Sequence, residues 1–405
     1  MKNFEKTVRA YALKNALAHD GKAQQGAIIS SLFHEGLKKT EVKKYIKQIS
    51  KTIAAVNRLS SENQQKEFEK LESSTSEREI REGLQELPKI KKSGVIMRIS
   101  PSPSGPLHIG HALVFCLNML YIEKYGGTFY VRIEDTNPEN IYKPAYSMIK
   151  KESKWLSKNK SKIIIQSERI PLYYKYAVKL INKKQAYICE CSPDLFKKHV
   201  LKKEDCGCRN LALKIHKERW KKMLDKTSKG YNQGEAVLRF KSLKGMKDKN
   251  PAMRDFPLAR INTTKHPIQG KKYKVWPLMN LAVTADDIEL KMTHIIRGKD
   301  HRDNALRQKM MYKALGKKFP WVGFIGKIKF KDINLSTTKI RQDIEAGRYA
   351  GWDDPDLPTI ASLKKQKFKP QAFYKFSEQV GLSEVDKVID KKEYFTLLNA
   401  FNKEK

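Results

Sequence analysis

The sequence has no apolar run near the roughly 18–20 residues that a membrane-spanning helix needs. Its first residues, MKNFEKTVRAYALKNALAHDGK, are charged throughout and contain no apolar signal core. No internal repeat is visible, and there are only five cysteines among 405 residues. These absences argue against a membrane-spanning, secreted or repeat protein, and we expect a cytoplasmic chain of two to four domains.

Acidic residues are few: Asp and Glu number 44 against 82 Lys and Arg, which gives a formal net charge of +38. A soluble small domain needs a net charge of only about 2–8. A lysine-rich proteome would explain this excess without any function. A polyanionic partner would explain it through many separated phosphate contacts. Nucleic acid is favoured over a membrane surface, because no basic amphipathic helix with a clean apolar face stands out.

The pattern of apolar and polar residues changes several times along the chain. Residues 1–88 have helical periodicity, and the polar stretch 73–94 reads as a linker or a loosely docked helix. GVIMRIS and GGTFYVRIED then predict two short buried strands that flank one helix, a βαβ unit. Residues 187–274 look irregular, and the last sixty look helical, with no repeated short strands after residue 345.

A stiff loop joins the first predicted strand to its helix, with the sequence PSPSGPLHIGH at residues 101–111. Pro101, Pro103 and Pro106 fix their own φ angles and favour extended conformations before them. The chain therefore leaves the strand along one path. Gly105 and Gly110 lack side chains where a phosphate could approach the backbone.

The helix that starts near Gly110 is expected to point free N–H groups and a partial positive charge at this spot. His108 and His111 lie beside it and can donate to phosphate oxygens. The pattern predicts a nucleotide triphosphate site at the carboxyl end of a parallel strand. The alternative is a Pro/Ser linker followed by a packing helix with incidental histidines. A zinc pair is disfavoured, because a third ligand and the Glu of H-E-x-x-H are missing.

Four of the five cysteines fall within CECSPDLFKKHVLKKEDCGC, as two C-x-C pairs fourteen residues apart. In a cytoplasmic chain such clustering indicates metal rather than disulfides. Four thiolates suit tetrahedral Zn²⁺, which would order a lysine-rich segment that has little core of its own. The alternative is four reduced, buried thiols. The expected ligands are Cys189, Cys191, Cys206 and Cys208, whereas Cys116 belongs to the core.

The loop PSPSGPLHIGH resembles the HIGH signature of class I aminoacyl-tRNA synthetases, in the form of the archaeal-type glutamyl-tRNA synthetases. The likeness continues through YVRIEDTNPE, HIIRGKDH, LSTTKIRQDIEAGRYAGWDDPDLPTI and the N-terminal YALKNALAHDGKAQQGAIIS. It implies an α/β fold, with a Rossmann-like parallel-sheet catalytic domain and an inserted acceptor-binding domain. The implied divisions are an N-terminal helical extension (1–88), the catalytic domain in two halves (89–186 and 275–345), the zinc-containing insertion (187–274) and a helical stem-contact region (346–405).

Two arginines are the candidates for the substrate side chain. Arg98 and Arg297 each end or follow a short strand and could meet a carboxylate as a planar fork. The resemblance implies that they hold the γ-carboxylate of glutamate and that Glu134 meets its α-ammonium group. Ordinary strand-edge salt bridges are the alternative. The glutamate-binding residues implied by the resemblance are Arg98, Ser100, Ser102, Glu134, Asn280 and Arg297.

LSTTKI occupies the place of the second class I signature, KMSKS, although its lysine follows STT instead of bracketing a serine. A mobile loop there would bring hydroxyls and an ammonium group to the ATP phosphates. The same residues could also cap the helix that follows. The ATP-binding residues implied by the resemblance are Pro106, His108, Gly110, His111, Ser336, Thr337 and Lys339. Of these, His108, His111 and Lys339 would serve catalysis together with Mg²⁺.

The resemblance implies ATP-dependent ligation of L-glutamate to tRNA(Glu) through glutamyl-adenylate, with glutamate activated only when tRNA is present. Family members usually continue into two β-barrels that read the anticodon. A separate polypeptide could carry such barrels, or the enzyme could recognise only the acceptor and D arms. A shortened relative that glutamylates a modified base, of the glutamyl-queuosine type, is disfavoured by the helical extension. A non-catalytic RNA-binding module would tolerate loss of Arg98 and Arg297, which are present.

Overall fold

The computed structural model describes residues 4–38, 40–75, 83–332 and 335–404. The chain divides into two compact units, Met1–Arg81 and Glu82–Lys405. The first unit therefore ends before residue 88, where the sequence analysis placed the end of the helical extension. Part of the expected linker, residues 76–82, lies outside the described residues. Among the described residues, no helix is long and apolar enough to cross a membrane.

The first unit is helical, as its periodicity predicts. Alternation of lysines with apolar residues gives its third helix one buried face, carried by Ile49, Ile53 and Val56. The amide of Gln64 is fully buried and donates to the Val56 carbonyl at 3.0 Å. This hydrogen bond ties the fourth helix to the end of the third. The helices are α1 (Phe4–Leu17), α2 (Gln25–His34), α3 (Val42–Val56), α4 (Ser61–Leu71) and the short 3₁₀ helix η1 (Glu72–Ser74).

The second unit is built on parallel strands. β1 pairs with β2, β2 with β3, and β8 with β9, in each case in parallel register. The Thr293 amide donates to the Ile96 carbonyl at 3.0 Å, so the β8–β9 pair lies beside β1. These strands are β1 (Val95–Ile99), β2 (Gly127–Ile133), β3 (Ser161–Ile165), β8 (His294–Gly298) and β9 (Trp321–Ile325). The predicted βαβ unit and α/β fold are confirmed.

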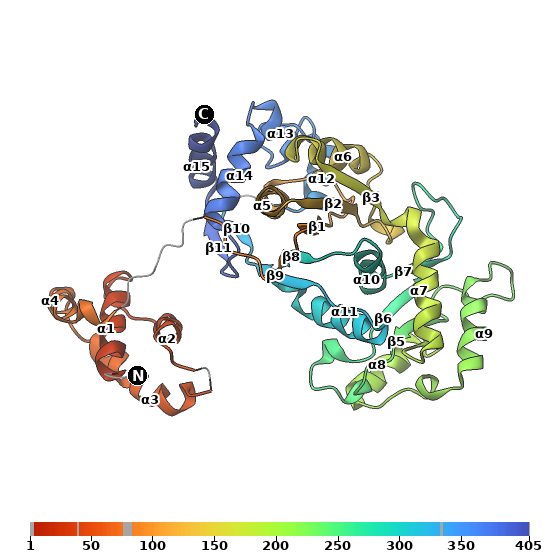
Figure 1. The fold of residues 1–405 in the computed structure, drawn as a ribbon, viewed down its shortest axis with the longest axis horizontal. Helices are drawn as coiled ribbons and strands as arrows, with labels where there is room; N and C mark the ends of the chain where they lie inside the picture. Colours follow the sequence, from red (N-terminus) through yellow and green to blue (C-terminus); the bar gives the residue numbers. More distant parts are fainter. Residues whose placement is uncertain (1–3, 39, 76–82, 333–334, 405) are drawn as a thin grey trace. The chain divides into compact units, whose positions relative to one another are not determined.

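Helices cover both faces of these strands, with α5 and α6 on one side and α10 and α11 on the other (Figure 1). α5 is apolar nearly all round, because it packs between the sheet and α14. Cys116 lies in its core-facing part with no exposed surface, as predicted. The bounds are α5 (Ile109–Tyr125), α6 (Ala145–Leu156), α10 (Met279–Glu289) and α11 (Arg302–Ala314).

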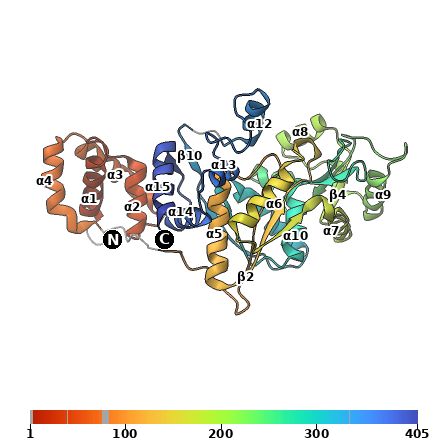
Figure 2. The ribbon, with the colours of Figure 1, turned by 90° about the horizontal axis from the view of Figure 1, so that it is seen from above.

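The segment that looked irregular contains an antiparallel sheet of four strands, in the order β4-β5-β6-β7. Each strand has only three to five residues, too few to show a clear alternation in the sequence. Figure 2 shows β4, α8 and α9 at one end of this unit, away from α5. The elements are α7 (Ile170–Asn182), β4 (Ala186–Cys189), α8 (Pro193–Lys202), α9 (Leu213–Leu224), β5 (Val237–Phe240), β6 (Pro257–Ile261) and β7 (Val275–Pro277).

The C-terminal part is not helical throughout. β11 (Lys387–Ile389) pairs in parallel with β10 (Ile328–Phe330). The helices there are α12 (Thr337–Glu345), α13 (Ile360–Lys365), α14 (Pro370–Val380) and α15 (Lys391–Lys403). The remaining 3₁₀ helices are η2 (Pro138–Asn140), η3 (Gln166–Arg169), η4 (Gly207–Asn210), η5 (Gly245–Lys247), η6 (Pro251–Met253) and η7 (Lys299–His301).

Candidate active site

The two histidines form a capping box at the start of α5. His108 is the N-cap, and its Nδ1 accepts the Gly110 amide at 3.1 Å. In return, Nδ1 of His111 accepts the His108 amide at 3.3 Å. The ring centroids lie 3.8 Å apart. Because each Nδ1 atom accepts a hydrogen bond from a backbone amide, each neutral ring carries its own proton on Nε2.

Both imidazoles are uncharged at neutral pH. Burial, together with the neighbouring His111, holds the pKa of His108 well below its usual range. Burial lowers the pKa of His111 to about 4. The pair therefore offers two N–H donors without adding positive charge.

One expectation for this helix start is wrong. The sequence analysis predicted free amides at the beginning of the helix. In the structure, the Ile109 amide donates to the Pro358 carbonyl at 3.0 Å, and that of Gly110 is held by His108. A Cβ on Gly110 would lie 3.0 Å from the His108 ring, so the space there is filled by the imidazole. The hydrogen-bond donors that remain at this point are the ring N–H groups, not the amides of Ile109 and Gly110.

The two signature segments touch each other. The hydroxyls of Ser104 and Thr337 lie 2.8 Å apart, which joins the proline loop to the start of α12. A Cβ on Gly105 would lie 2.9 Å from Cβ of Thr337, so this glycine permits the close approach of α12. Ser336 caps α12 by accepting the Lys339 amide. Residues 333–334 of the expected loop lie outside the described residues.

Arg98 is buried in an ion-paired network below this loop. Its Nε and Nη2 donate to the two oxygens of Asp287 at 2.7 and 2.8 Å, and its Nη1 donates to Ser100 at 3.1 Å. Arg132, which is fully buried, donates to the same carboxylate at 2.6 Å. Burial alone would raise the pKa of Asp287, but the Arg98 and Arg132 guanidinium groups hold it at about 2.

Arg297 differs from Arg98, because no carboxylate lies within ion-pair distance of it among the described residues. It is 9% exposed, its Nη1 donates to Gln308 at 2.9 Å, and its Nε has no hydrogen-bond partner in the described chain. Burial and the positive charge of Arg98 lower its pKa to about 10. Arg98 and Arg297 lie near the carboxyl ends of the neighbouring strands β1 and β8.

The other predicted glutamate-binding residues surround these arginines unevenly. Oε1 of Glu134 accepts from Arg132 at 2.9 Å, and the carboxylate is 17% exposed. Asn280 accepts from Gln308, the residue that also holds Arg297. Ser100 is bonded to Arg98 and Arg132, whereas Ser102 is exposed.

Sequence analysis missed the acidic partners of this network. Asp286 and Asp287 lie on α10 inside the apolar run LMNLAVTADDIEL, where two adjacent buried carboxylates signal partners of opposite charge. Asp286 accepts from Arg169 at 2.7 Å and from Tyr173 at 2.8 Å. Arg132 inside the strand YVRIED gave the matching signal.

The four predicted cysteines come together at the tip of the antiparallel sheet. Their sulfur atoms all lie within 4.8 Å of one another, and those of Cys189 and Cys206 are 3.8 Å apart. A tetrahedral zinc ion with Zn–S bonds of about 2.3 Å sets sulfurs about 3.8 Å apart. A hydrogen bond from Cys189 lowers the pKa of Cys206 to about 5, which favours the thiolate that metals bind. The donor set fits Zn²⁺.

The comparisons with known proteins agree on one family. Residues 94–405 match the family described as tRNA synthetases class I (E and Q), catalytic domain. The chain is 39% identical over 384 residues to a glutamate–tRNA ligase of Methanocaldococcus jannaschii, with 95% of this chain and 68% of the relative covered. It is also 39% identical to a glutamate–tRNA ligase of Methanosphaera stadtmanae, over 98% of this chain and 70% of the relative.

A solved structure shows the same fold. The glutamate–tRNA synthetase of Elizabethkingia anophelis superposes with a TM-score of 0.50 at 19% identity, over 75% of this chain and 70% of that one. This level of identity supports the fold of the second unit and carries nothing further.

Proposed function

The chain belongs to the class I tRNA synthetases for glutamate and glutamine, and we propose that it joins L-glutamate to the 3′ end of tRNA(Glu) at the expense of ATP. The observation that carries this proposal is the buried guanidinium of Arg297, to which no described residue supplies a carboxylate partner, beside Arg98, which is paired with Asp287. A buried cation without an anion is costly, and an anionic ligand removes that cost.

The γ-carboxylate of glutamate fits this position. Nε of Arg297 has no partner among the described residues, and Arg98 keeps two of its five N–H groups after its bonds to Asp287 and Ser100. In this proposal Arg297 is the main anchor and Arg98 is the second. Glutamine would leave the Arg297 charge unpaired, at about 3–5 kcal/mol, which is enough discrimination without an editing step.

The amino group of glutamate is assigned to Glu134. One oxygen of this carboxylate accepts from Arg132, and the other accepts no hydrogen bond from the described residues. The partly exposed side chain can therefore meet an ammonium group. Asn280, through Gln308, fixes the direction of the Arg297 fork.

The phosphates of ATP are assigned to the two signature segments. The Nε2–H groups of His108 and His111 donate to phosphate oxygens, and Ser336, Thr337 and Lys339 approach from α12. Lys339 is exposed and free to move towards a ligand. Bound Mg²⁺ would supply further charge neutralisation there.

The reaction needs no general acid or base in this proposal. The α-carboxylate of glutamate attacks the α-phosphorus of ATP, and pyrophosphate leaves. The 2′-OH of the terminal adenosine of tRNA then attacks the adenylate carbonyl, and AMP leaves. Catalysis comes from positioning and from neutralisation of charge that develops on the phosphates.

Zinc is proposed as a structural ion held by Cys189, Cys191, Cys206 and Cys208. It would fix η4 against β4 and so hold the tip of the insertion, whose lysines face the acceptor arm. A separate polypeptide that reads the anticodon, and a cytoplasmic location, stay predictions.

Pyrophosphate exchange tests the function. We expect exchange with glutamate plus tRNA, little exchange without tRNA, and none with glutamine. Aminoacylation of total tRNA identifies the charged species. The combined His108→Ala and His111→Ala variant should lose at least about a hundredfold in kcat, as when oxyanion donors are removed. Full activity of that variant would remove the phosphate role of both rings.

A further inference from the structure

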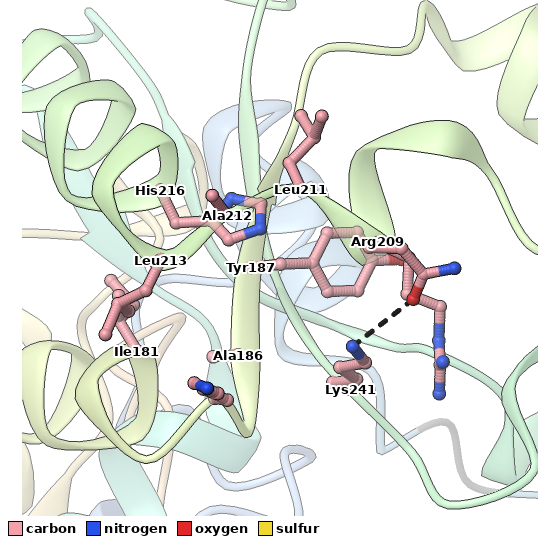
Figure 3. Close-up of a pocket in the computed structure, with 11 residues that line it drawn as sticks. Ile181, Ala186, Tyr187, Arg209, Leu211, Ala212, Leu213, His216 and Lys241 are labelled. Atoms are coloured by element: carbon pink, nitrogen blue, oxygen red, sulfur yellow. Dashed lines mark hydrogen bonds between the residues drawn. The ribbon is translucent and has the colours of Figure 1, made fainter.

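A cavity of about 300 Å³ lies between α7, β4, η4 and the start of α9, far from the arginine network. We call it the α9 cavity. Figure 3 shows His216, Tyr187, Arg209 and Lys241 around one space. The residues that line the α9 cavity are Ile181, Lys184, Ala186, Tyr187, Arg209, Asn210, Leu211, Ala212, Leu213, His216 and Lys241.

Positively charged residues line part of the α9 cavity, although one of them, Arg209, is ion-paired with Asp255 and Asp205. Lys184, Arg209 and Lys241 line it, and none of the described residues that line it is acidic. Neither lysine forms an ion pair with any described residue, and Lys241 makes only a 3.4 Å hydrogen bond to Asn210 among side chains of the described chain. Burial and the nearby Arg209 guanidinium lower the pKa of Lys241, against the opposite effect of Asp255 and Asp205.

A buried donor without a partner lies in the same wall. His216 is 5% exposed, and its Nδ1 accepts the Ile188 amide at 3.4 Å. Its proton is therefore on Nε2, which is buried and bonded to no described residue. A buried donor left unpaired costs free energy, and this one would be satisfied by an acceptor in the cavity.

The N-terminus of α9 adds a third independent feature. Its N-cap, Ala212, has no side chain that could cap the helix, and no described residue accepts the amides of Leu213 and Lys214. α9 has 12 residues, so its N-terminal partial charge is well developed. Leu213 with its uncapped amide, two lysines and an imidazole with an unpaired N–H among the described residues line the same cavity, and phosphate sites use these kinds of donor.

The opposite half of the cavity is apolar. Ile181, Leu211 and Leu213 line it, and Figure 3 shows the Tyr187 ring between His216 and Arg209. The volume lies at the lower end of the range of about 300–1,000 Å³ typical of small-molecule sites, and it exceeds what a bare phosphate ion fills. Unpaired RNA bases commonly pack on apolar and aromatic side chains while donors hold the backbone.

We propose that the α9 cavity binds one unpaired nucleotide of RNA, with the phosphate on Lys184, Lys241, His216 and the α9 amides, and the base on the apolar side. The identity of this RNA as tRNA rests on the proposed function, whereas the nucleotide site does not. The cysteine cluster supports the cavity, because η4 carries both Cys208 and the lining residues Arg209 and Asn210.

Calorimetry with uridine 5′-monophosphate and uridine tests the site in the full chain. The catalytic site is first filled with glutamyl-sulfamoyl-adenosine, so that only a second site can respond. We expect the monophosphate to bind at least about tenfold more tightly than uridine, because the charged hydrogen bonds are lost with the phosphate. The His216 side-chain signals in NMR spectra should shift during the same titration.

Variants give the decisive comparison. Lys184→Ala with Lys241→Ala should weaken uridine monophosphate binding about tenfold or more. Lys217→Ala with Lys221→Ala removes the same charge from the exposed surface of α9, outside the cavity, and should change binding less than about twofold. Equal binding by both double variants, or no binding by the native chain, would overturn the proposal.

Affinity for tRNA then identifies the source of the nucleotide. Weaker tRNA binding by the cavity variant than by the surface variant supports RNA. If the cavity variant loses only the mononucleotide, the RNA assignment is wrong and the site takes free nucleotides. A native chain that binds the monophosphate but does not glutamylate tRNA would disprove the proposed function and leave the nucleotide site standing.

Discussion

Arg98 on β1 and Asp287 on α10 form a buried ion pair through two hydrogen bonds, 2.7 and 2.8 Å long, across 189 positions of sequence. Arg132 donates to the same carboxylate and also pairs with Glu134 and Asp286, so Asp287 joins two guanidinium groups beneath the proline loop. The network holds the floor of the proposed glutamate site and leaves Arg297 as its unneutralised member.

Replacement of that aspartate should be severely destabilising. Asp287→Asn leaves Arg98 without its ion-pair partner and takes one of three carboxylates from Arg132, which keeps Glu134 and Asp286. We expect the free energy of unfolding to fall by about 3–5 kcal/mol in urea titrations. Asp353→Asn, which removes an exposed partner of Lys365, should change the free energy of unfolding by about 0.5 kcal/mol or less. A similar small change for both would show that the buried pair contributes little.

Removal of the Arg297 charge should separate stability from activity. Arg297→Gln takes away a buried cation with no described anion, so thermal stability should be unchanged or higher. The kcat/KM for glutamate should fall about a hundredfold or more, from loss of the charged contact. Arg302→Gln, at an exposed ion pair, is the matched control: it should neither raise thermal stability nor lower the kcat/KM for glutamate. Wild-type kcat/KM in the Arg297 variant would contradict the assignment.

The contact between the signature segments should matter for turnover. Ser104→Ala and Thr337→Val each remove one side of the 2.8 Å contact, and each should lower the kcat of pyrophosphate exchange several-fold. The double variant should be little worse than either single one, with a coupling of about 0.5–1.5 kcal/mol. Gly105→Ala should be more harmful, since its Cβ meets Thr337 at 2.9 Å. Strictly additive effects of the two hydroxyl changes would mean that the contact plays no part in turnover.

The stability contributed by Glu152 should depend on pH. This carboxyl group lies under the proline loop, accepts the Leu107 amide at 2.7 Å, and has its pKa raised by burial from 4.5 to about 8. Because the unfolded chain gives up this proton first, native stability falls as the pH rises from about 4.5 to 8. Glu152→Gln should therefore be more stable than the native chain at pH near 8, by at least about 1 kcal/mol, and equal to it near pH 4. A pH-independent difference in thermal melts would disprove this.

The cysteine cluster should contain one zinc ion. Metal analysis of the purified chain should find about one zinc per chain, and Cys206→Ser should reduce it strongly. Chelation should loosen η4 and α8, seen as faster amide exchange there, while the parallel sheet stays protected. Cys116→Ser, in the core of α5, should leave the zinc content unchanged. Full protection of η4 without metal would show that reduced thiols suffice.

Local sequence patterns predicted the parts of the fold that are close in sequence. β1, α5 and β2 lie where the hydrophobic pattern and the proline loop predicted them, because a buried strand and an apolar helix each have a characteristic hydrophobic pattern in sequence. β4, β5 and β7 were missed because strands of three or four residues are too short for that signal, and β6 begins at Pro257, a residue that weakens a strand pattern. β11 was missed because it is also too short.

In the candidate site, too, sequence analysis predicted local features and missed contacts between distant residues. The sequence singled out Arg98 and Arg297 as candidates. That Arg98 is ion-paired and Arg297 is not depends on Asp287, a residue far from Arg98 along the chain. The free amides predicted at the start of α5 are occupied by His108 and by Pro358, and the latter bond crosses some 250 positions. Such long-range partners leave no local pattern.

The pairing of β11 with β10 gives the C-terminal segment a mechanical role. β10 directly precedes the segment that leads to Ser336, and the Lys391 amide donates a hydrogen bond to the Asp332 carboxylate at 2.9 Å. Displacement of β11, for example by a fusion near residue 390, would remove the neighbour of β10 and loosen the chain that leads to α12, the helix to which the proposed function assigns the ATP phosphates. In this way the C-terminal segment would act on the proposed phosphate site through the backbone.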